Sequence, residues 1–138
     1  MSKELIIPRT LAQKLFTAAQ DSPDTEICGF VASAHGQPQS VYPIRNVATN
    51  PKTEFEMCAE DQVSAMKKIR ECGQSLFAVY HSHPTAPPIP SVRDLEHMGY
   101  PEAWMMIISL NTKGVLELRA WSAKTGEMQE TPVRILMT

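Results

Sequence analysis

Residues 76–84 read LFAVYHSHP, an uninterrupted apolar run that leads directly into two histidines, His81 and His83. An apolar run of this kind is typical of a strand that is covered on both faces, so residues 76–80 are predicted to lie at the centre of a sheet. Alternate side chains of a strand share a face. If the strand continues through His83, the two imidazoles point in the same direction.

A proline-rich segment follows this run, with prolines at positions 84, 87, 88 and 90. Such a segment is stiff and cannot form a helix. Ser91 is expected to begin a short helix that bears Asp94. A stiff connector returns this carboxylate toward the histidines with less loss of chain entropy than a flexible loop.

Apolar periodicity and turn residues place the remaining elements. Helices are predicted over residues 10–21 and 59–72, and strands over residues 27–34, 40–44, 53–57, 104–110 and 115–121, with a last strand ending near Ile135. Thr10 and Gln13 form a candidate capping box, His35-Gly36 a turn, and Gly73 a helix stop. No repeat or linker interrupts the pattern, so one α/β domain over residues 1–138 is expected, a mixed sheet flanked by helices.

Composition narrows the functional classes. A net charge of −2 gives no reason to expect binding to nucleic acid or to an anionic membrane. No apolar run approaches the roughly 20 residues that span a bilayer, and the start has no signal-peptide pattern, so we expect a cytoplasmic protein. Cys28, Cys58 and Cys72 are odd in number and unpaired in spacing, which fits a reducing compartment and small buried side chains.

His81, His83 and Asp94 form a ligand set typical of catalytic zinc, because three protein ligands leave a fourth position open for water. Bound zinc lowers the pKa of its water from 15.7 to about 7, which suits a hydrolase. Other interpretations stay open at this point. A His-x-His pair also arises by chance, and Ser91-x-x-Asp94 is equally a capping box in which Asp94 only supports the helix start.

The required base cannot be chosen from spacing among fifteen acidic residues. Glu26 directly precedes the apolar strand, where desolvation would raise the pKa of its carboxyl into a useful range. The alternative is an exposed loop residue. His97 shares the helix face of Asp94 and either supports it or lies on the surface, and His35 is expected in a turn.

The pattern His81-Ser82-His83-Pro84 followed by Ser91-x-x-Asp94 resembles the JAMM motif of MPN-domain metalloproteases. Residues 26–30 (EICGF) resemble the family segment with the catalytic glutamate, and residues 46–48 (NVA) another recurring segment. The resemblance covers nearly the whole chain and implies the MPN core, which is related to cytidine deaminases. It assigns one zinc per chain to His81, His83 and Asp94, the catalytic base to Glu26, and oxyanion binding to Ser91. Relatives often have two cysteines after the glutamate, whereas here Ile27 takes the first place.

The family implies hydrolysis of the amide bond after the C-terminal Gly-Gly of a ubiquitin-like protein, by a water on zinc activated by Glu26. The segments 49–57 and 94–104 are too short for long ubiquitin-gripping insertions, so the chain resembles the compact prokaryotic branch, whose implied partners are small β-grasp sulfur-carrier proteins. Two alternatives remain: a catalytically silent MPN module that binds a partner, and a zinc hydrolase of another small amide or cell-wall peptide. The oligomeric state is open, with a homodimer as one candidate.

Overall fold

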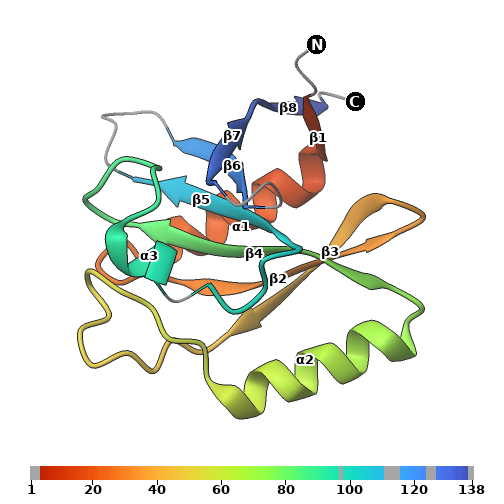
Figure 1. The fold of residues 1–138 in the computed structure, drawn as a ribbon, viewed down its shortest axis with the longest axis horizontal. Helices are drawn as coiled ribbons and strands as arrows, with labels where there is room; N and C mark the ends of the chain where they lie inside the picture. The colour runs from red at the N-terminus through yellow and green to blue at the C-terminus, as the bar shows by residue number, and fades with distance from the viewer. Residues whose placement is uncertain (1–3, 97, 111–115, 124–126, 137–138) are drawn as a thin grey trace.

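The computed structural model of the chain describes residues 4–96, 98–110, 116–123 and 127–136. Its elements are, in chain order, β1 (Leu5–Pro8), α1 (Arg9–Asp21), β2 (Cys28–Ala34), β3 (Gln37–Ile44), α2 (Ala59–Glu71), β4 (Ser75–His83), α3 (Val92–Glu96), β5 (Trp104–Ser109), β6 (Glu117–Ser122), β7 (Gln129–Thr131) and β8 (Val133–Leu136) (Figure 1).

Six of these strands form the main sheet, in the order β3-β2-β4-β5-β6-β7. β4 pairs antiparallel with β2 and parallel with β5, and the other neighbouring pairs are antiparallel. The apolar run 76–80 therefore lies inside the sheet, as predicted, and the expected fold class of a mixed, mainly antiparallel sheet flanked by helices is confirmed.

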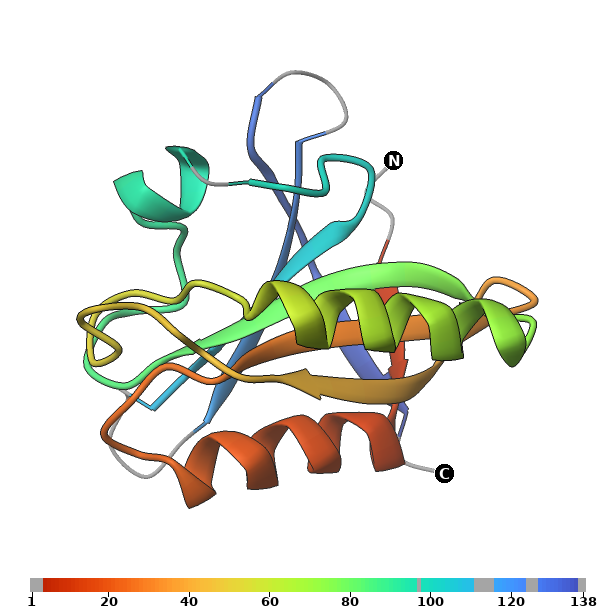
Figure 2. The ribbon, with the colours of Figure 1, turned by 90° about the horizontal axis from the view of Figure 1, so that it is seen from below.

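The two long helices cover opposite faces of this sheet (Figure 2). Leu11 and Leu15 of α1 pack in one core cluster with Val31 of β2, and Ile69 of α2 packs in the other with Phe30. Neighbouring residues of β2 thus contribute side chains to different core clusters, as the alternation of side chains along a strand requires. No helix in the described part of the chain has the length and apolar character needed to cross a bilayer.

Two predicted chain reversals are confirmed, and both use backbone with positive φ. His35 and Gly36 have φ of 53° and 76° and join β2 to β3 in a two-residue hairpin turn. Gly73, with φ of 68°, ends α2. The amides of Gly73 and Gln74 donate to the carbonyls of Arg70 and Ile69, the paired bonds of a Schellman motif, which satisfies the last carbonyls of the helix.

Three local predictions are wrong. α1 begins at Arg9 directly after Pro8 and has no side-chain cap among the described residues, so Thr10 lies inside the first turn. The expected strand 53–57 reduces to a single bridge between Asn46 and Met57. The last strand divides around Pro132, because proline has no amide for the ladder, into β7 beside β6 and β8 beside β1.

We expect Gly29→Ala to lower the free energy of unfolding by about 1–3 kcal/mol through overpacking. A Cβ at this β2 position would lie 2.5 Å from the carbonyl oxygen of Tyr42 and 2.6 Å from the hydroxyl of Tyr80. Chemical denaturation measures the loss. Gly99→Ala is the control, because nothing lies within 4 Å of the Cβ it would add; equal stability of the two variants would contradict the packing argument.

Candidate metal centre

The histidine pair lies at the end of β4, which continues through His83. Both imidazoles therefore face the same side of the sheet, as expected, and their Nε2 atoms lie 3.1 Å apart. His81 is completely buried and His83 is 3% exposed. The backbone at His81 is paired on both sides, with Cys28 of β2 and Ile107 of β5, so the ring positions are fixed by the sheet.

The proline-rich connector after β4 is held by three consecutive carbonyls. The carbonyl of Ala86 accepts from Ser109 Oγ at 2.7 Å, that of Pro87 from His83 Nδ1 at 2.8 Å, and that of Pro88 from Trp121 Nε1 at 3.1 Å. Prolines restrict the backbone of this segment, and these bonds attach it to β4, β5 and β6. The connector is thus stiff, as the sequence predicts, and it has one defined path to α3.

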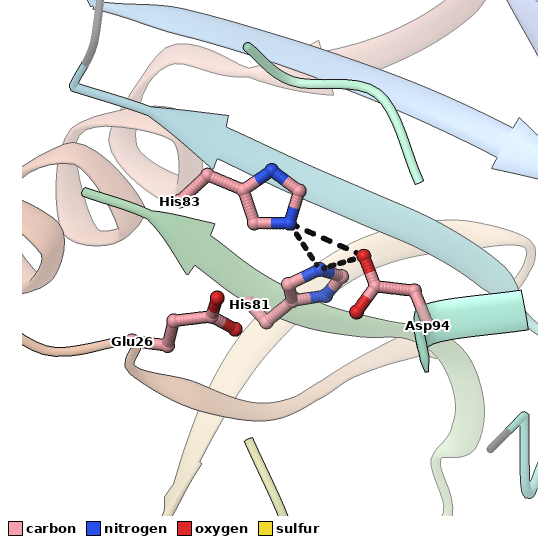
Figure 3. Close-up of side chains that lie close together, drawn as sticks. All are labelled: Glu26, His81, His83 and Asp94. Atoms are coloured by element: carbon pink, nitrogen blue, oxygen red, sulfur yellow. Dashed lines mark hydrogen bonds and ion pairs between the residues drawn. The ribbon is translucent and has the colours of Figure 1, made fainter. Parts of the chain in front are cut away.

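Asp94 enters the site from the first turn of α3 and is buried. Its Oδ2 lies 3.0 Å from His81 Nε2 and 3.2 Å from His83 Nε2 (Figure 3). The capping box is also present: Ser91 N donates to Asp94 Oδ2 at 2.9 Å, and Asp94 N donates to Ser91 Oγ at 3.0 Å. One oxygen of Asp94 therefore caps the helix and faces both imidazoles, so the capping and ligand interpretations of this residue are compatible.

The atoms that converge here are sources of lone pairs. A carbonyl only accepts, so His83 Nδ1 donates a proton to Pro87 O, and the neutral ring then presents a lone pair at Nε2. That lone pair faces Asp94 Oδ2 across 3.2 Å. The arrangement is repulsive unless a proton or a cation lies among the three atoms; either an Nε2–H of an imidazole or a metal ion would fill this place.

The pKa shifts follow from burial and from this crowding. Burial opposes ionisation of Asp94, but hydrogen bonds from both imidazoles and from Ser91 outweigh it and hold the carboxyl pKa well below its ordinary value. Burial lowers the pKa of His81. For His83, burial also acts downward, but Asp94 and the Pro87 carbonyl raise the pKa above the ordinary value. The carboxylate is thus ionised and attracts a cation or a proton.

Glu26 joins this cluster from the segment before β2. Each of Glu26, His81, His83 and Asp94 offers one ligand atom, and these atoms all lie within 4.8 Å of one another. The Glu26 residue is 5% exposed, so the alternative of an exposed loop residue is wrong. Burial raises the pKa of its carboxyl to about 7, with smaller effects from His83 and Asp94. Its Oε1 has no hydrogen-bond partner among the described residues, which leaves it available for a proton.

Two contacts of the site have no signal in the sequence spacing. Phe55, in the segment expected to be a strand, stacks on His81 with ring centroids 4.4 Å apart. Arg93, beside Asp94 on α3, forms an ion pair with Glu54 at 3.0 Å. Residues 54–55 thus form one wall of the site, a role that only the folded loop reveals.

The other singled-out residues lie outside the cluster. Cys28 and Cys58 are buried as expected, and burial raises the Cys28 thiol pKa to about 12, so this side chain packs rather than reacts. Cys72 is exposed, which corrects the expectation of burial, because it follows the end of α2. His35 lies in its predicted turn, and His97 lies outside the described residues.

Comparisons with known proteins identify the family of this chain. The family of prokaryotic homologs of the JAB domain matches residues 8–124. A desampylase from Pyrococcus furiosus is 34% identical over 85% of this chain and 79% of its own length. A CysO-cysteine peptidase from Mycobacterium tuberculosis is 26% identical over 86% of this chain and 82% of its own length.

The fold is also that of a solved structure. A JAB1/MPN domain protein from Archaeoglobus fulgidus superposes with a TM-score of 0.59 at 18% identity, over 97% of this chain and 99% of that one. The expectation of a peptidase-class enzyme is confirmed by the family match and the two named enzymes. The chain belongs to the prokaryotic branch of the JAB/MPN (JAMM) family.

Proposed function

We propose that this chain is a zinc-dependent isopeptidase or peptidase that hydrolyses the amide bond after the C-terminal Gly-Gly of a small ubiquitin-like protein of the sulfur-carrier type. The observation that carries the proposal is the convergence of His81, His83 and Asp94 on one point, with the unpartnered carboxylate oxygen of Glu26 beside it. A silent module would not require this complete set of groups.

The donor set fits Zn²⁺. Tetrahedral ligands with bonds of 2.0–2.1 Å lie about 3.4 Å from one another. The three converging atoms lie 3.0–3.2 Å apart, so they need to open by only a few tenths of an ångström. Two imidazole nitrogens and one carboxylate oxygen would hold about one zinc per chain and leave a position for water. The His83 Nδ1 bond to Pro87 O orients the ring with Nε2 inward, as is usual for metal-binding histidines.

The chain's own groups supply the remaining steps. When bound, zinc would polarise the scissile carbonyl and acidify the attacking water. Glu26 accepts the proton of that water at its carboxylate and later gives it to the leaving amine, a double role that suits a carboxyl with a raised pKa. The Ser91 hydroxyl accepts the Asp94 amide at 3.0 Å, so its own proton stays free to bind the developing oxyanion.

The substrate class rests on the relatives and on the size of the site's surroundings. The names desampylase and CysO-cysteine peptidase support a protein conjugate or protein–amino acid amide as substrate. The segments between Ile44 and Ala59 and between Glu96 and Trp104 leave little chain for a large docking insertion, which favours a small protein partner. A Gly-Gly tail has no Cβ atoms and can approach closely as an added extended segment. This activity would take place in the cytoplasm.

Metal binding is tested on purified protein loaded with zinc and dialysed. We expect about one zinc per chain by elemental analysis, and a marked loss for His83→Ala because two protein ligands remain. His35→Ala is the matched control, since this histidine lies in the exposed β2–β3 turn, and it should keep its zinc. A wild-type chain without zinc after this treatment would contradict the assignment of a zinc site.

Catalysis is tested with fusions of candidate sulfur-carrier proteins, whose terminal Gly-Gly is amide-linked to a reporter peptide, followed by mass spectrometry of the new C-terminus. Wild type should cut after the second glycine, and Glu26→Gln should keep zinc but lose roughly 10²–10⁴-fold in turnover. Glu56→Gln makes the same change at an exposed carboxylate of the neighbouring loop and should retain most activity. If the zinc-loaded chain cuts only other amides, the sulfur-carrier assignment is wrong; if it cuts none, the silent module is supported.

Ser91 requires variants that separate capping from catalysis. Ser91→Ala should reduce turnover by roughly 10²–10³-fold as an oxyanion donor is lost, and should cost about 0.5–2 kcal/mol of stability as the cap is lost. Ser91→Gly should be as slow as Ser91→Ala yet more stable, because glycine is tolerated at this helix position. Normal turnover in the glycine variant would assign Ser91 to capping alone.

A further inference from the structure

Glu26 lies in an irregular segment between α1 and β2, where no helix or strand orders its backbone. The amide of Glu26 donates to the carbonyl of Pro51 at 2.7 Å. Its carbonyl accepts from Asn46 Nδ2 at 3.0 Å. The next amide, of Ile27, donates to Ser82 Oγ at 2.9 Å, between the two histidines. The backbone on both sides of the carboxylate is therefore held from two directions, the loop 46–57 and β4.

Asn46 uses its whole carboxamide in this arrangement. Nδ2 donates to the carbonyls of Glu26 and Glu54, both at 3.0 Å, and Oδ1 accepts the amides of Ala48 and Glu56, both at 3.0 Å. Within residues 53–57 the half-buried side chain thus binds the carbonyl of Glu54 and the amide of Glu56, beside the backbone bond from Val47 N to Glu56 O. It joins parts of the 46–57 loop to one another and to the segment that carries Glu26.

The same carboxamide reaches the histidines through Phe55. Asn46 binds the residues on either side of Phe55, the carbonyl of Glu54 and the amide of Glu56. Phe55 stacks on His81. One side chain therefore fixes, at the same time, the backbone of Glu26 and the ring that packs against His81.

We propose that Asn46 is a positioning residue for Glu26, with Ser82 as its counterpart on β4. Because Oε1 of Glu26 has no partner within the described part of the chain, the carboxylate is aimed by its backbone rather than by bonds of its own. Loss of the Asn46 donor frees the backbone carbonyl of Glu26 and lets the carboxylate leave the line of the attacking water. The inference rests on the proposed function in that it takes Glu26 as the base.

The test is Asn46→Asp in the full-length, zinc-loaded chain, with a Gly-Gly fusion that the wild type cleaves. Aspartate keeps the acceptor for Ala48 and Glu56 but loses the donor to Glu26 and Glu54. We expect kcat to fall roughly 10- to 100-fold, as is typical when a group that orients an active-site residue is lost. KM and the zinc content should stay near the wild-type values, because Asn46 contacts no proposed ligand side chain.

Gln74→Glu is the matched control. Gln74 is another carboxamide that joins separate segments: it accepts from Tyr42 Oη at 2.7 Å and donates to Ser40 Oγ at 2.9 Å. It lies just before β4, at the end of the strand opposite the histidines. The change from amide to acid is the same, so a general loss of stability should appear in both variants, and a loss of kcat only at Asn46.

A double-variant comparison separates positioning from a structural role. In the Glu26→Gln background, Asn46→Asp should lower the residual kcat no further, because the carboxylate that it aims is already gone. A further 10-fold fall in that background, an equal fall in Gln74→Glu, or wild-type kcat in Asn46→Asp each overturns the inference. If Asn46→Asp does not fold, Ser82→Ala tests the same idea, that Glu26 is positioned through its backbone. A loss of kcat with zinc retained supports this positioning, and an unchanged kcat refutes it.

The activity of the wild type tests the proposed function separately from the positioning role of Asn46. A wild-type chain that cleaves no fusion refutes the proposed function and, with it, the role of Asn46. A wild type that is active and depends on Glu26, but is indifferent to Asn46→Asp, refutes only the positioning role.

Discussion

The site depends on the close approach of three atoms that repel one another unless a proton or a cation lies among them. His81 Nε2, His83 Nε2 and Asp94 Oδ2 lie within 3.2 Å of one another in a buried environment, where electrostatic repulsion is poorly screened. The scaffold keeps these atoms together whether a proton or a cation lies among them. The scaffold is stiff because β4 is paired on both sides and the connector has three bonded carbonyls in succession. In the proposed zinc site, the fold would therefore bring the ligand atoms together before the metal binds.

Glu26, the proposed base, is held in a different way from the three proposed ligands. His81, His83 and Asp94 are fixed through their side chains, and Asp94 also receives the Ser91 amide. Glu26 has an oxygen with no partner in the described chain, and its backbone takes the bonds instead. A carboxylate that must accept and release a proton cannot be held by strong donors, because they would depress its pKa. Holding the backbone and leaving the carboxylate buried but unbonded raises the pKa to about 7 and keeps the position defined.

The parts of the molecule that the sequence predicted correctly are those with local causes. The apolar run of β4, the Gly73 helix stop and the His35-Gly36 turn each depend on a few adjacent residues. The ligand candidates followed from the spacing of His81, His83 and Asp94 along one strand, one stiff connector and one short helix. Two failures were also local: the capping box at Thr10 does not form, and Pro132 divides the last strand. The others were non-local. β1 pairs with β8 across nearly the whole chain, and in residues 53–57 the Asn46 side chain binds two backbone groups where a regular strand was expected. A hydrogen bond from a side chain ten residues away does not change the apolar periodicity from which strands are predicted.

In the capping box at Ser91, a role in helix capping and a role in metal binding do not exclude each other. An ionised carboxylate has about four lone-pair positions, so Asp94 can accept an amide and still face a metal. The amide of Ser91 reaches the same Oδ2 that faces the imidazoles, and this bond restricts the rotamer of Asp94 before any cation arrives. Entropy that a free aspartate would lose on binding metal has already been lost in forming the helix. The capping box therefore does not compete with the proposed ligand role of Asp94, because the same bond can serve both.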